Sequence, residues 1–453
     1  MRIRLSIPLF TKEIALSTGA SLHGDEKIIT HLTTNSKEVE AGDMFIALQG
    51  QKFDGEEFVS EALARGGTVM STKNDAAIQV SDTRDALLCL AAYYADRLPR
   101  LKHKIAITGS VGKTTTKEFL KLLVSQKHLV HANKGNCNNE IGMPLTVLSA
   151  PEDCEVLICE MGMNHKGEIS RMSKALRPTA AIITNIGRAH IGNLGSKEAI
   201  AEAKMEILDG MSNEAVVVPY REELLNKIKH KITFSIESRS ADFLITDAPE
   251  SQVAIYKRGA EILTTKFDIF EQHIRNCLIA GIAISDYIGL SGDDINRGVL
   301  QISRDNLRQN TLYIQNRYFY TDYYNASPES IYAALQSVLE TQGYEEKSLI
   351  LGDILELGAS EKSICEEIGA RLAHSGICNL YLFGRMAKSI KSAAHSGGFP
   401  LERIFINSDL SRPEITVSQV IKNSRPGALI LMKASRGVAL ERVIECLNED
   451  NTR

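Results

Sequence analysis

The chain has 453 residues, a formal net charge of −4 and a hydrophobic content of 43%. This length exceeds one ordinary domain, so we expect about two to four domains. The slight negative charge argues against a nucleic-acid partner, and no run approaches the ~20 apolar residues that span a bilayer. Eight cysteines are scattered without a zinc-site spacing, and the first residues carry no secretory signal. We therefore expect a cytoplasmic protein that does not insert into a membrane.

The first hundred residues combine short strands with turn signals. Residues 43–48 predict a strand, and residues 58–63 predict the start of a helix that stops at Gly66-Gly67. The polar stretch 98–104 then leads into a new apolar run. We place the first domain boundary there, which gives a small α/β domain over residues 1–103.

An apolar strand breaks into a glycine loop at the start of the next region. The run is Ile105-Ala106-Ile107-Thr108-Gly109-Ser110-Val111-Gly112-Lys113-Thr114-Thr115-Thr116, followed by a helical pattern. Backbone N–H groups of such a loop and the helix N-terminus bind phosphate. Lys113 can then reach the β/γ-phosphates, and the Thr114 hydroxyl can ligate Mg²⁺. Ile107 replaces the first glycine of the general motif, and the alternative is an ordinary strand–turn–helix junction.

Two further apolar runs, 156–161 and 180–185, end on polar residues. Runs of this kind are typical of parallel strands buried on both faces, whose carboxyl ends carry the chemistry. Glu160 ends the first run and His190 follows the second. With Thr114 they could hold Mg²⁺ against the γ-phosphate. The alternatives are a capping or salt-bridging role for Glu160 and a structural role for His190.

Two other segments of the central region are ambiguous. Lys204 lies in a clear helical pattern over residues 196–207, and the residues alone favour a solvated lysine on a polar face. The segment 136–144 is dense in amides and turn formers. It could bind a polar ligand, or it could simply form a loop.

After a second polar stretch near residues 304–312, strands and helices alternate again. Strands are predicted at 318–322, 348–352, 379–384, 403–406 and 428–433. The predicted fold is α/β with three domains. They are a small N-terminal domain (1–103), a central phosphate-loop domain with a mostly parallel sheet (104–310) and a C-terminal Rossmann-like domain (311–453).

These motifs together resemble the Mur ligases, ATP-dependent enzymes that form amide bonds in peptidoglycan precursor synthesis. The segment 108–116 resembles the phosphate loop of that family, 184–190 its T-N-I-x-x-A/D-H segment, and 203–206 its A-K-x-E helix. More local matches at 138–146, 160–169, 322–330 and 351–358 resemble the branch that adds D-alanyl-D-alanine. The D-N-P-R box of the diaminopimelate-adding relatives is absent from the sequence.

The resemblance implies roles for individual residues. Lys113 would bind the γ-phosphate, Thr114 and Glu160 one Mg²⁺, and His190 a second Mg²⁺ completed by a carbamylated Lys204. Lys113, His190 and Lys204 would thus be the catalytic residues. The nucleotide would contact Thr108, Gly109, Ser110, Val111, Gly112, Lys113, Thr114, Thr115, Asn276, Arg304 and Asp322. The uridine nucleotide and its peptide would contact Asn35, Ser36, Lys37, Asp54, Asn138, Asn139 and Glu140.

The implied reaction joins UDP-N-acetylmuramoyl-tripeptide (UDP-MurNAc-tripeptide) to D-alanyl-D-alanine through an acyl-phosphate, with ATP and two Mg²⁺ ions as cofactors. We expect a monomer whose domains close about linkers near residues 103 and 310. Three alternatives stay open: a Mur or folylpolyglutamate-type ligase that adds another amino acid, a phosphate-loop ATPase without ligase chemistry, and an inactive scaffold.

Overall fold

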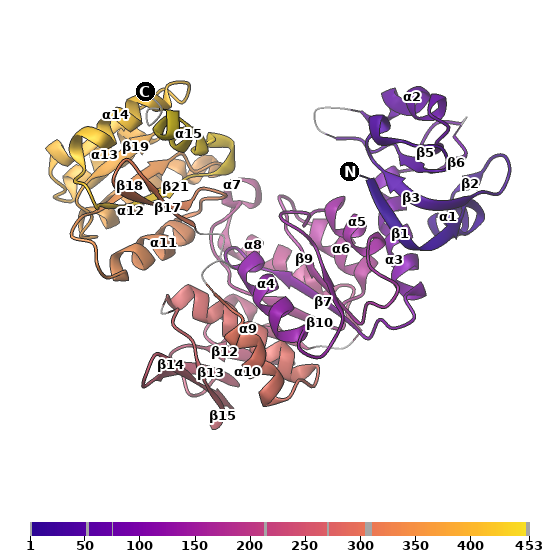
Figure 1. The fold of residues 1–453 in the computed structure, drawn as a ribbon, viewed down its shortest axis with the longest axis horizontal. Coiled ribbons are helices and arrows are strands. Elements are labelled where there is room, and N and C mark those ends of the chain that lie inside the picture. Colours follow the sequence, from indigo (N-terminus) through magenta and orange to yellow (C-terminus); the bar gives the residue numbers. More distant parts are fainter. Residues whose placement is uncertain are drawn as a thin grey trace.

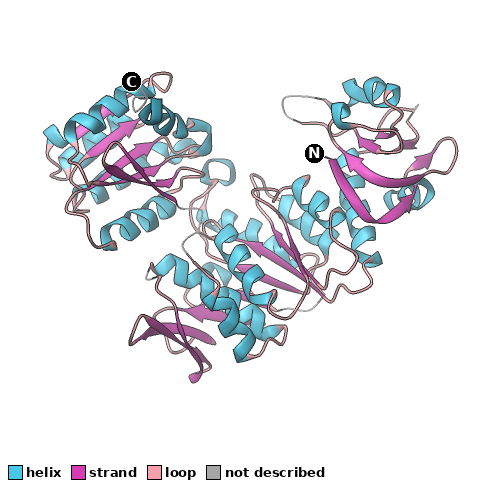
Figure 2. Ribbon diagram, viewed as in Figure 1, coloured by secondary structure: helices cyan, strands magenta, loops and turns pink. Residues whose placement is uncertain are grey.

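The computed structural model describes residues 2–50, 54–74, 76–212, 215–269, 271–303 and 310–449. They form three sheets with helices packed against them, and the three parts follow one another along the chain (Figure 1). Figure 2 shows that helices flank the strands of each sheet. No described helix is long and apolar enough to cross a membrane. The predicted three-domain α/β fold is confirmed.

The first sheet has the strand order β1-β3-β4-β5-β6-β2. Its strands β3 to β6 are parallel, whereas β1 and β2 pair antiparallel at the edges. The bounds are β1 Arg2–Phe10, β2 Ser21–Leu22, β3 Ile28–Thr33, β4 Met44–Ile46, β5 Thr68–Ser71 and β6 Ile78–Gln79, with helices α1 Thr11–Thr18, α2 Val59–Ala64 and α3 Thr83–Arg97. Both elements predicted in this part, at 43–48 and from 58, are present as β4 and α2.

The second sheet carries the phosphate-loop motif on an interior strand, β7. Its order is β15-β14-β13-β12-β11-β10-β7-β9-β8. Strands β7 to β13 are parallel, and β14 and β15 form an antiparallel ribbon that the sequence patterns did not predict. The strands are β7 His103–Thr108, β8 Val130–Ala132, β9 Val156–Glu160, β10 Ala180–Ile183, β11 Val216–Pro219, β12 Lys231–Ser235, β13 Phe243–Ala248, β14 Gln252–Lys257 and β15 Ala260–Lys266.

Helices cover both faces of this second sheet because its strands are apolar on both sides. They are α4 Lys113–Val124, α5 Gly142–Leu148, α6 Glu168–Leu176, α7 Ile191–Leu194, α8 Lys197–Met205, α9 Gln272–Tyr287 and α10 Gly292–Leu300. Along β7, Ile105 and Ile107 belong to the core formed with α4 and α9, whereas Ala106 belongs to the core on the opposite face. This alternation is what a parallel strand buried on both faces requires.

The third sheet is also mainly parallel, with the order β16-β17-β21-β18-β19-β20. Only β16 runs antiparallel to its neighbour. The strands are β16 Asn310–Ile314, β17 Arg317–Asp322, β18 Lys347–Gly352, β19 Leu380–Phe383, β20 Ile404–Asn407 and β21 Leu429–Lys433, and the helices are α11 Pro328–Glu340, α12 Glu361–Ala373, α13 Ala387–Ser396, α14 Pro413–Asn423 and α15 Glu441–Glu449. All five strands predicted here from the sequence are present within one or two residues.

The first and second parts share one hydrophobic core. A single cluster joins side chains of β1 and α3 to side chains of α5, α6 and β10. Across the same interface the Ser6 hydroxyl donates a hydrogen bond to the carbonyl of Ala150 over 2.8 Å, and Arg171 pairs with Asp85. The third part has its own core clusters. A shared core resists hinge motion, so we expect domain movement near residue 310 rather than near residue 103.

This shared core predicts that the first and second parts of the molecule lose structure as one unit. Leu90 in α3 is fully buried, and a Leu90→Ala substitution is expected to cost about 2–5 kcal/mol. Hydrogen exchange at increasing denaturant should show faster exchange in both the first and the second sheet, with the third unchanged. The matched control Leu349→Ala, at an equally buried position in β18, should affect the third sheet alone. Loss of protection confined to the first sheet in Leu90→Ala would contradict the prediction.

Candidate active site

The glycine loop lies between β7 and the N-terminus of α4, as the sequence predicts. Gly109 adopts a φ of 146°, and a Cβ there would lie 1.9 Å from the Thr184 hydroxyl oxygen. Gly112 caps α4 with a φ of 86°. Both positions therefore require glycine, because a side chain would meet the end of β10 or strain the backbone. The N-terminus of α4 opens directly onto the loop, which suits it to bind an anion.

The segment that follows β10 holds this loop in place through hydrogen bonds. The Asn185 side-chain oxygen accepts hydrogen bonds from the backbone N–H groups of Ser110 and Val111, at 3.1 and 2.9 Å. The Thr184 hydroxyl and the Asn185 amide both donate to the carbonyl of Val111. Gly187 in turn donates its N–H to the Ser110 hydroxyl. Residues 184–187 thus fix the shape of the loop, a role that sequence motifs alone did not assign.

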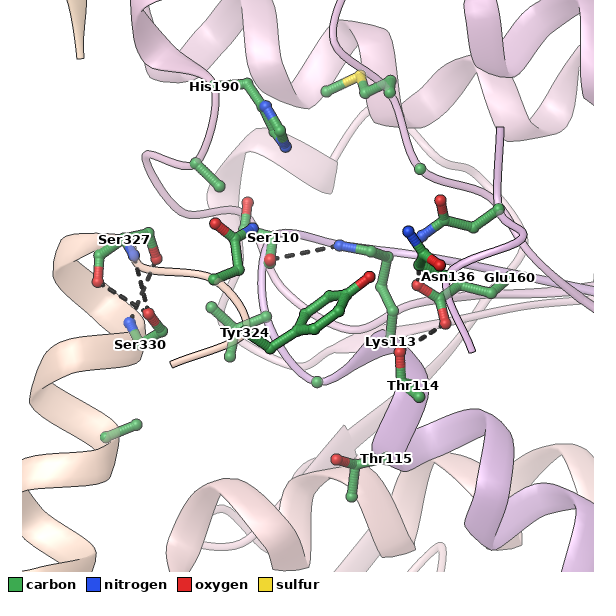
Figure 3. Close-up of a pocket in the computed structure, with 18 of the residues that line it drawn as sticks. Ser110, Lys113, Thr114, Thr115, Asn136, Glu160, His190, Tyr324, Ser327 and Ser330 are labelled. Carbon is green, nitrogen blue, oxygen red and sulfur yellow. Dashed lines mark hydrogen bonds between the residues drawn. The ribbon is translucent and has the colours of Figure 1, made fainter. Parts of the chain in front are cut away.

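Thr114 and Glu160 meet at the mouth of the loop (Figure 3). The Thr114 hydroxyl donates to one carboxylate oxygen of Glu160 over 2.6 Å, and Asn138 Nδ2 donates to the other over 2.7 Å. Glu160 is the last residue of β9 and is 2% exposed. Lys113 Nζ bonds to the carbonyls of Gly109 and Ser110, at 2.7 and 3.4 Å. The Thr114 hydroxyl and the Glu160 carboxylate thus lie side by side, while the Lys113 ammonium is turned toward its own loop.

A cavity of about 340 Å³ opens in front of these groups, between the second and third parts of the molecule. The second part contributes the loop residues Ser110 to Thr115 together with Asn138, Asn139, Glu160 and His190. The third part contributes Asp322 at the end of β17, with Tyr324, Asn325 and Lys433. Lys433 is buried, and its Nζ pairs with Asp322 over 3.0 Å. Of the predicted nucleotide residues, the consecutive loop residues Ser110 to Thr115 therefore come together with Asp322, which lies far from them in the sequence.

Asn276 borders two smaller cavities, of about 230 and 160 Å³, rather than the main one. His273 borders all three, although the sequence patterns gave it no role. Burial lowers the pKa of His273, which favours an uncharged imidazole. Thr108 is fully buried at the end of β7 below the loop. Arg304 lies outside the described residues.

Lys204 is 2% exposed, so the residue-based interpretation of a solvated lysine is wrong. It lies on the buried side of α8. Burial lowers the pKa of its ammonium well below the usual range, and the nearby positive charge of Lys113 lowers it further. The uncharged amine is therefore more accessible than in an exposed lysine. Helical periodicity did not reveal this, because the lysine occupies the face where an apolar residue is expected.

His190 contacts the third part of the molecule. Its Nδ1 lies 2.5 Å from a carboxylate oxygen of Glu356. Both residues adopt positive φ, 65° for His190 and 63° for Glu356, and the Glu356 carbonyl accepts a hydrogen bond from Gly192 over 2.8 Å. The bond with His190 lowers the pKa of Glu356. The contact between His190 and the Glu356 carboxylate therefore stabilises the folded protein above the ordinary carboxyl pKa. This stabilisation is lost as the pH falls through the lowered pKa of Glu356.

Arg188 joins the same two parts of the molecule. Its backbone N–H and Nε donate to the two oxygens of Glu329 at 3.0 and 2.8 Å, and its Nη2 donates to Glu367 over 2.8 Å. Glu329 lies in the first turn of α11, and Glu367 lies on α12. These acidic partners raise the pKa of Arg188 further above its usual range. Residues 187–192 are thus held by the third part at several points.

The predicted uridine and peptide residues lie away from the main cavity, except Asn138 and Asn139. Several of them make local contacts. Asn35 and Asp54 accept backbone N–H groups at the starts of short 3₁₀ turns, and Ser36 donates to Glu61 over 2.6 Å. Asn139 accepts the N–H of Gly142, the first residue of α5, over 2.8 Å. Lys37 is exposed. Glu140 pairs with Arg171 at 3.2 Å, while burial raises its pKa.

The oxygen donors at the loop fit Mg²⁺. This ion is usually held by one or two carboxylates together with phosphate oxygens and water, and Thr114 with Glu160 offers a hydroxyl and a carboxylate. Within the described ranges, no group of three or more His, Cys, Asp or Glu side chains is placed to hold a metal. A second ion at His190 would therefore need further ligands.

Comparison with known proteins finds relatives that match almost the whole chain. Family models described as the Mur ligase family catalytic domain, the Mur ligase middle domain and the Mur ligase glutamate ligase domain match residues 28–106, 107–284 and 308–436. The chain is 34% identical to a UDP-N-acetylmuramoyl-tripeptide–D-alanyl-D-alanine ligase of Bacillus subtilis, over 96% of this chain and 97% of that protein. For the Escherichia coli protein of the same name the identity is 29%, over 95% and 96%.

Solved structures of MurF proteins also superpose on almost the whole chain. A crystal structure of MurF from Acinetobacter baumannii superposes with a TM-score of 0.87 at 27% identity, covering 99% of this chain and 100% of that one. A crystal structure of MurF ligase from Thermotoga maritima in complex with ADP gives a TM-score of 0.79 at 28% identity, covering 92% and 97%.

The Arg188 contacts predict how the third part stays docked. Arg188→Ala removes these contacts. Because the ion pairs are partly exposed, we expect the free energy that holds the third part against the second to fall by about 1 kcal/mol. Small-angle scattering should then show a larger radius of gyration. The control Arg258→Ala, which removes an exposed pair with Asp242 inside the second part, should leave it unchanged. An unchanged radius in both variants would show that other contacts hold the third part.

Proposed function

This chain belongs to the Mur ligase family, and we propose that it joins UDP-N-acetylmuramoyl-tripeptide to D-alanyl-D-alanine with the use of ATP. The observation that carries the proposal is the main cavity. One side is lined by a phosphate loop with Lys113 and the Thr114–Glu160 pair, and the other by strand ends of the third part. ATP and an incoming amine can therefore meet there. The eight cysteines, scattered along the sequence without a C-x-x-C pair, agree with a reaction in the reducing cytoplasm.

The first step activates a poor electrophile. A carboxylate oxygen of the tripeptide attacks the γ-phosphorus of ATP, which forms an acyl-phosphate and releases ADP. The loop N–H groups and the N-terminus of α4 bind the phosphates. Lys113, which now bonds to carbonyls of its own loop, can turn to the transferring group and offset its charge. Thr114 and Glu160 would hold Mg²⁺, which when bound neutralises phosphate charge during the transfer.

In the second step, the free amine of D-alanyl-D-alanine attacks the acyl carbon. The carbon–oxygen bond to phosphate breaks, phosphate leaves, the amine loses a proton and an amide forms. Because water would hydrolyse the acyl-phosphate, the cavity has to close before reaction. Arg188 and Glu356 connect the two walls of the cavity and would stabilise the closed arrangement.

We extend the proposal to Lys204 and His190 as a second metal-binding region. The lowered pKa of Lys204 favours a neutral amine, which can attack CO₂ and become a carbamate. The new carboxylate would add an oxygen ligand, since the described residues hold no group of three or more His, Cys, Asp or Glu side chains placed to bind a metal. Asn276, Asp322 and the first-domain residues Asn35, Ser36, Lys37 and Asp54 keep the nucleotide and uridine roles implied by the family.

Phosphate release tests the ligase activity. With ATP and UDP-N-acetylmuramoyl-tripeptide, release should depend on added D-alanyl-D-alanine, because the amine completes the turnover. Lys113→Met should abolish it, whereas Lys121→Met, at an exposed position on the same helix, should not. Turnover without an amine would indicate an ATPase, and dependence on a different amino acid would indicate another ligase of the family.

The carbamate makes a separate prediction about Lys204. Lys204→Ala should lower the rate on the order of 10²-fold, and added bicarbonate should not restore it. The wild type should lose activity in CO₂-free buffer and regain it with bicarbonate, and ¹³CO₂ should give a carbamate signal in NMR. The control Lys197→Ala changes a more exposed lysine of the same helix. Full activity of Lys204→Ala would exclude the role.

A further inference from the structure

A fully buried lysine follows the phosphate loop. Lys117 lies in α4, one turn after Thr114, and is 0% exposed. Its Nζ donates to the carbonyl of Asn133 over 2.6 Å and pairs with Glu118 over 2.9 Å. A buried ammonium is costly unless such partners compensate it. Its hydrogen bond ties the helix that carries Thr114 to the chain that leaves β8.

Asn133, which accepts the hydrogen bond from Lys117, also bonds to the backbone of Glu160. It is 2% exposed and directly follows β8, the neighbour of β9. Its side-chain oxygen accepts the backbone N–H of Glu160 over 2.9 Å, and its amide donates to the carbonyls of Cys137 and Glu160 at 3.0 and 3.4 Å. One side chain therefore satisfies both backbone groups of Glu160.

The same contacts fix the loop that carries Asn138. Asn133 holds that loop through Cys137, and the carbonyl of Asn138 accepts the N–H of Gly162 over 2.7 Å. The side chain of Asn138 then reaches the Glu160 carboxylate. Backbone and carboxylate of Glu160 are thus both set by one connected network that begins at Lys117.

We propose that Lys117 and Asn133 are positioning residues, which hold the Glu160 carboxylate in place for the divalent cation that accompanies ATP. Neither is among the residues that line the three cavities described above, so both act through Glu160. The inference rests on the proposed function, because it assumes a cation at Thr114 and Glu160. Partners of this kind commonly change metal affinity tenfold to a hundredfold when they are removed.

The test compares Lys117→Met and Asn133→Ala with the control Lys121→Met. Methionine keeps most of the unbranched length of the lysine and removes the charge and the donor. In both test variants, the Mg²⁺ concentration for half-maximal ADP binding should rise about 10- to 100-fold, whereas ADP affinity without Mg²⁺ and the KM for D-alanyl-D-alanine should stay unchanged. Hydrogen exchange of residues 156–162 should become faster. The control should match the wild type in every measurement.

Folded variants with an unchanged Mg²⁺ requirement and unchanged exchange would overturn the proposal. If Lys117→Met does not fold, Asn133→Ala decides by the same two measurements, since it keeps the buried lysine bonded to a main-chain carbonyl. If ADP binding by the wild type is independent of Mg²⁺, the metal part of the proposed function fails. In that case, hydrogen exchange of residues 156–162 in the variants tests whether Lys117 and Asn133 position Glu160. Faster exchange supports this role, and unchanged exchange refutes it.

Discussion

The hydrogen bonds between the phosphate loop and residues 184–187 are the contacts on which the site depends. They join two loops at the carboxyl ends of adjacent parallel strands, β7 and β10. Each such bond contributes only about 0.5–1.5 kcal/mol, but together they leave the loop little freedom. The loop is therefore shaped before a nucleotide arrives, which reduces the ordering cost of binding. The close approach of Gly109 to Thr184 is the steric condition for this arrangement.

The same segment extends to the third part of the molecule. Beyond Gly187, Arg188 meets Glu329 and Glu367, and His190 meets Glu356. Loop shape and domain position are thus connected through seven consecutive residues. The first part is fixed differently, because it shares a hydrophobic core with the second. The contrast between a polar and an apolar interface explains why we expect only the third part to move readily during catalysis.

Charge is distributed unevenly around the site. Lys113 and Lys433 bond to oxygen atoms, whereas Lys204 is buried and its pKa is lowered. Lys117, also buried, is compensated by a carbonyl and a carboxylate. A lysine in an otherwise ordinary helix can therefore serve as an electrostatic partner, a reactive amine or a positioning group. Its surroundings decide among these roles, and Lys204 illustrates how local pattern misleads.

The sequence by itself determined the fold class, the glycine loop and the convergence of Thr114, Glu160 and His190 on one edge of the sheet. Apolar runs predict buried parallel strands, and the carboxyl ends of such strands meet at one edge. Only the tertiary structure decided the burial of Lys204, the Asn133–Glu160 bonds, the Arg188–Glu329 contact and the core shared by the first two parts. These depend on which surfaces of separate elements face each other. Periodicity and motif spacing indicate which strand ends share an edge, but they do not indicate which side chains of separate elements contact one another.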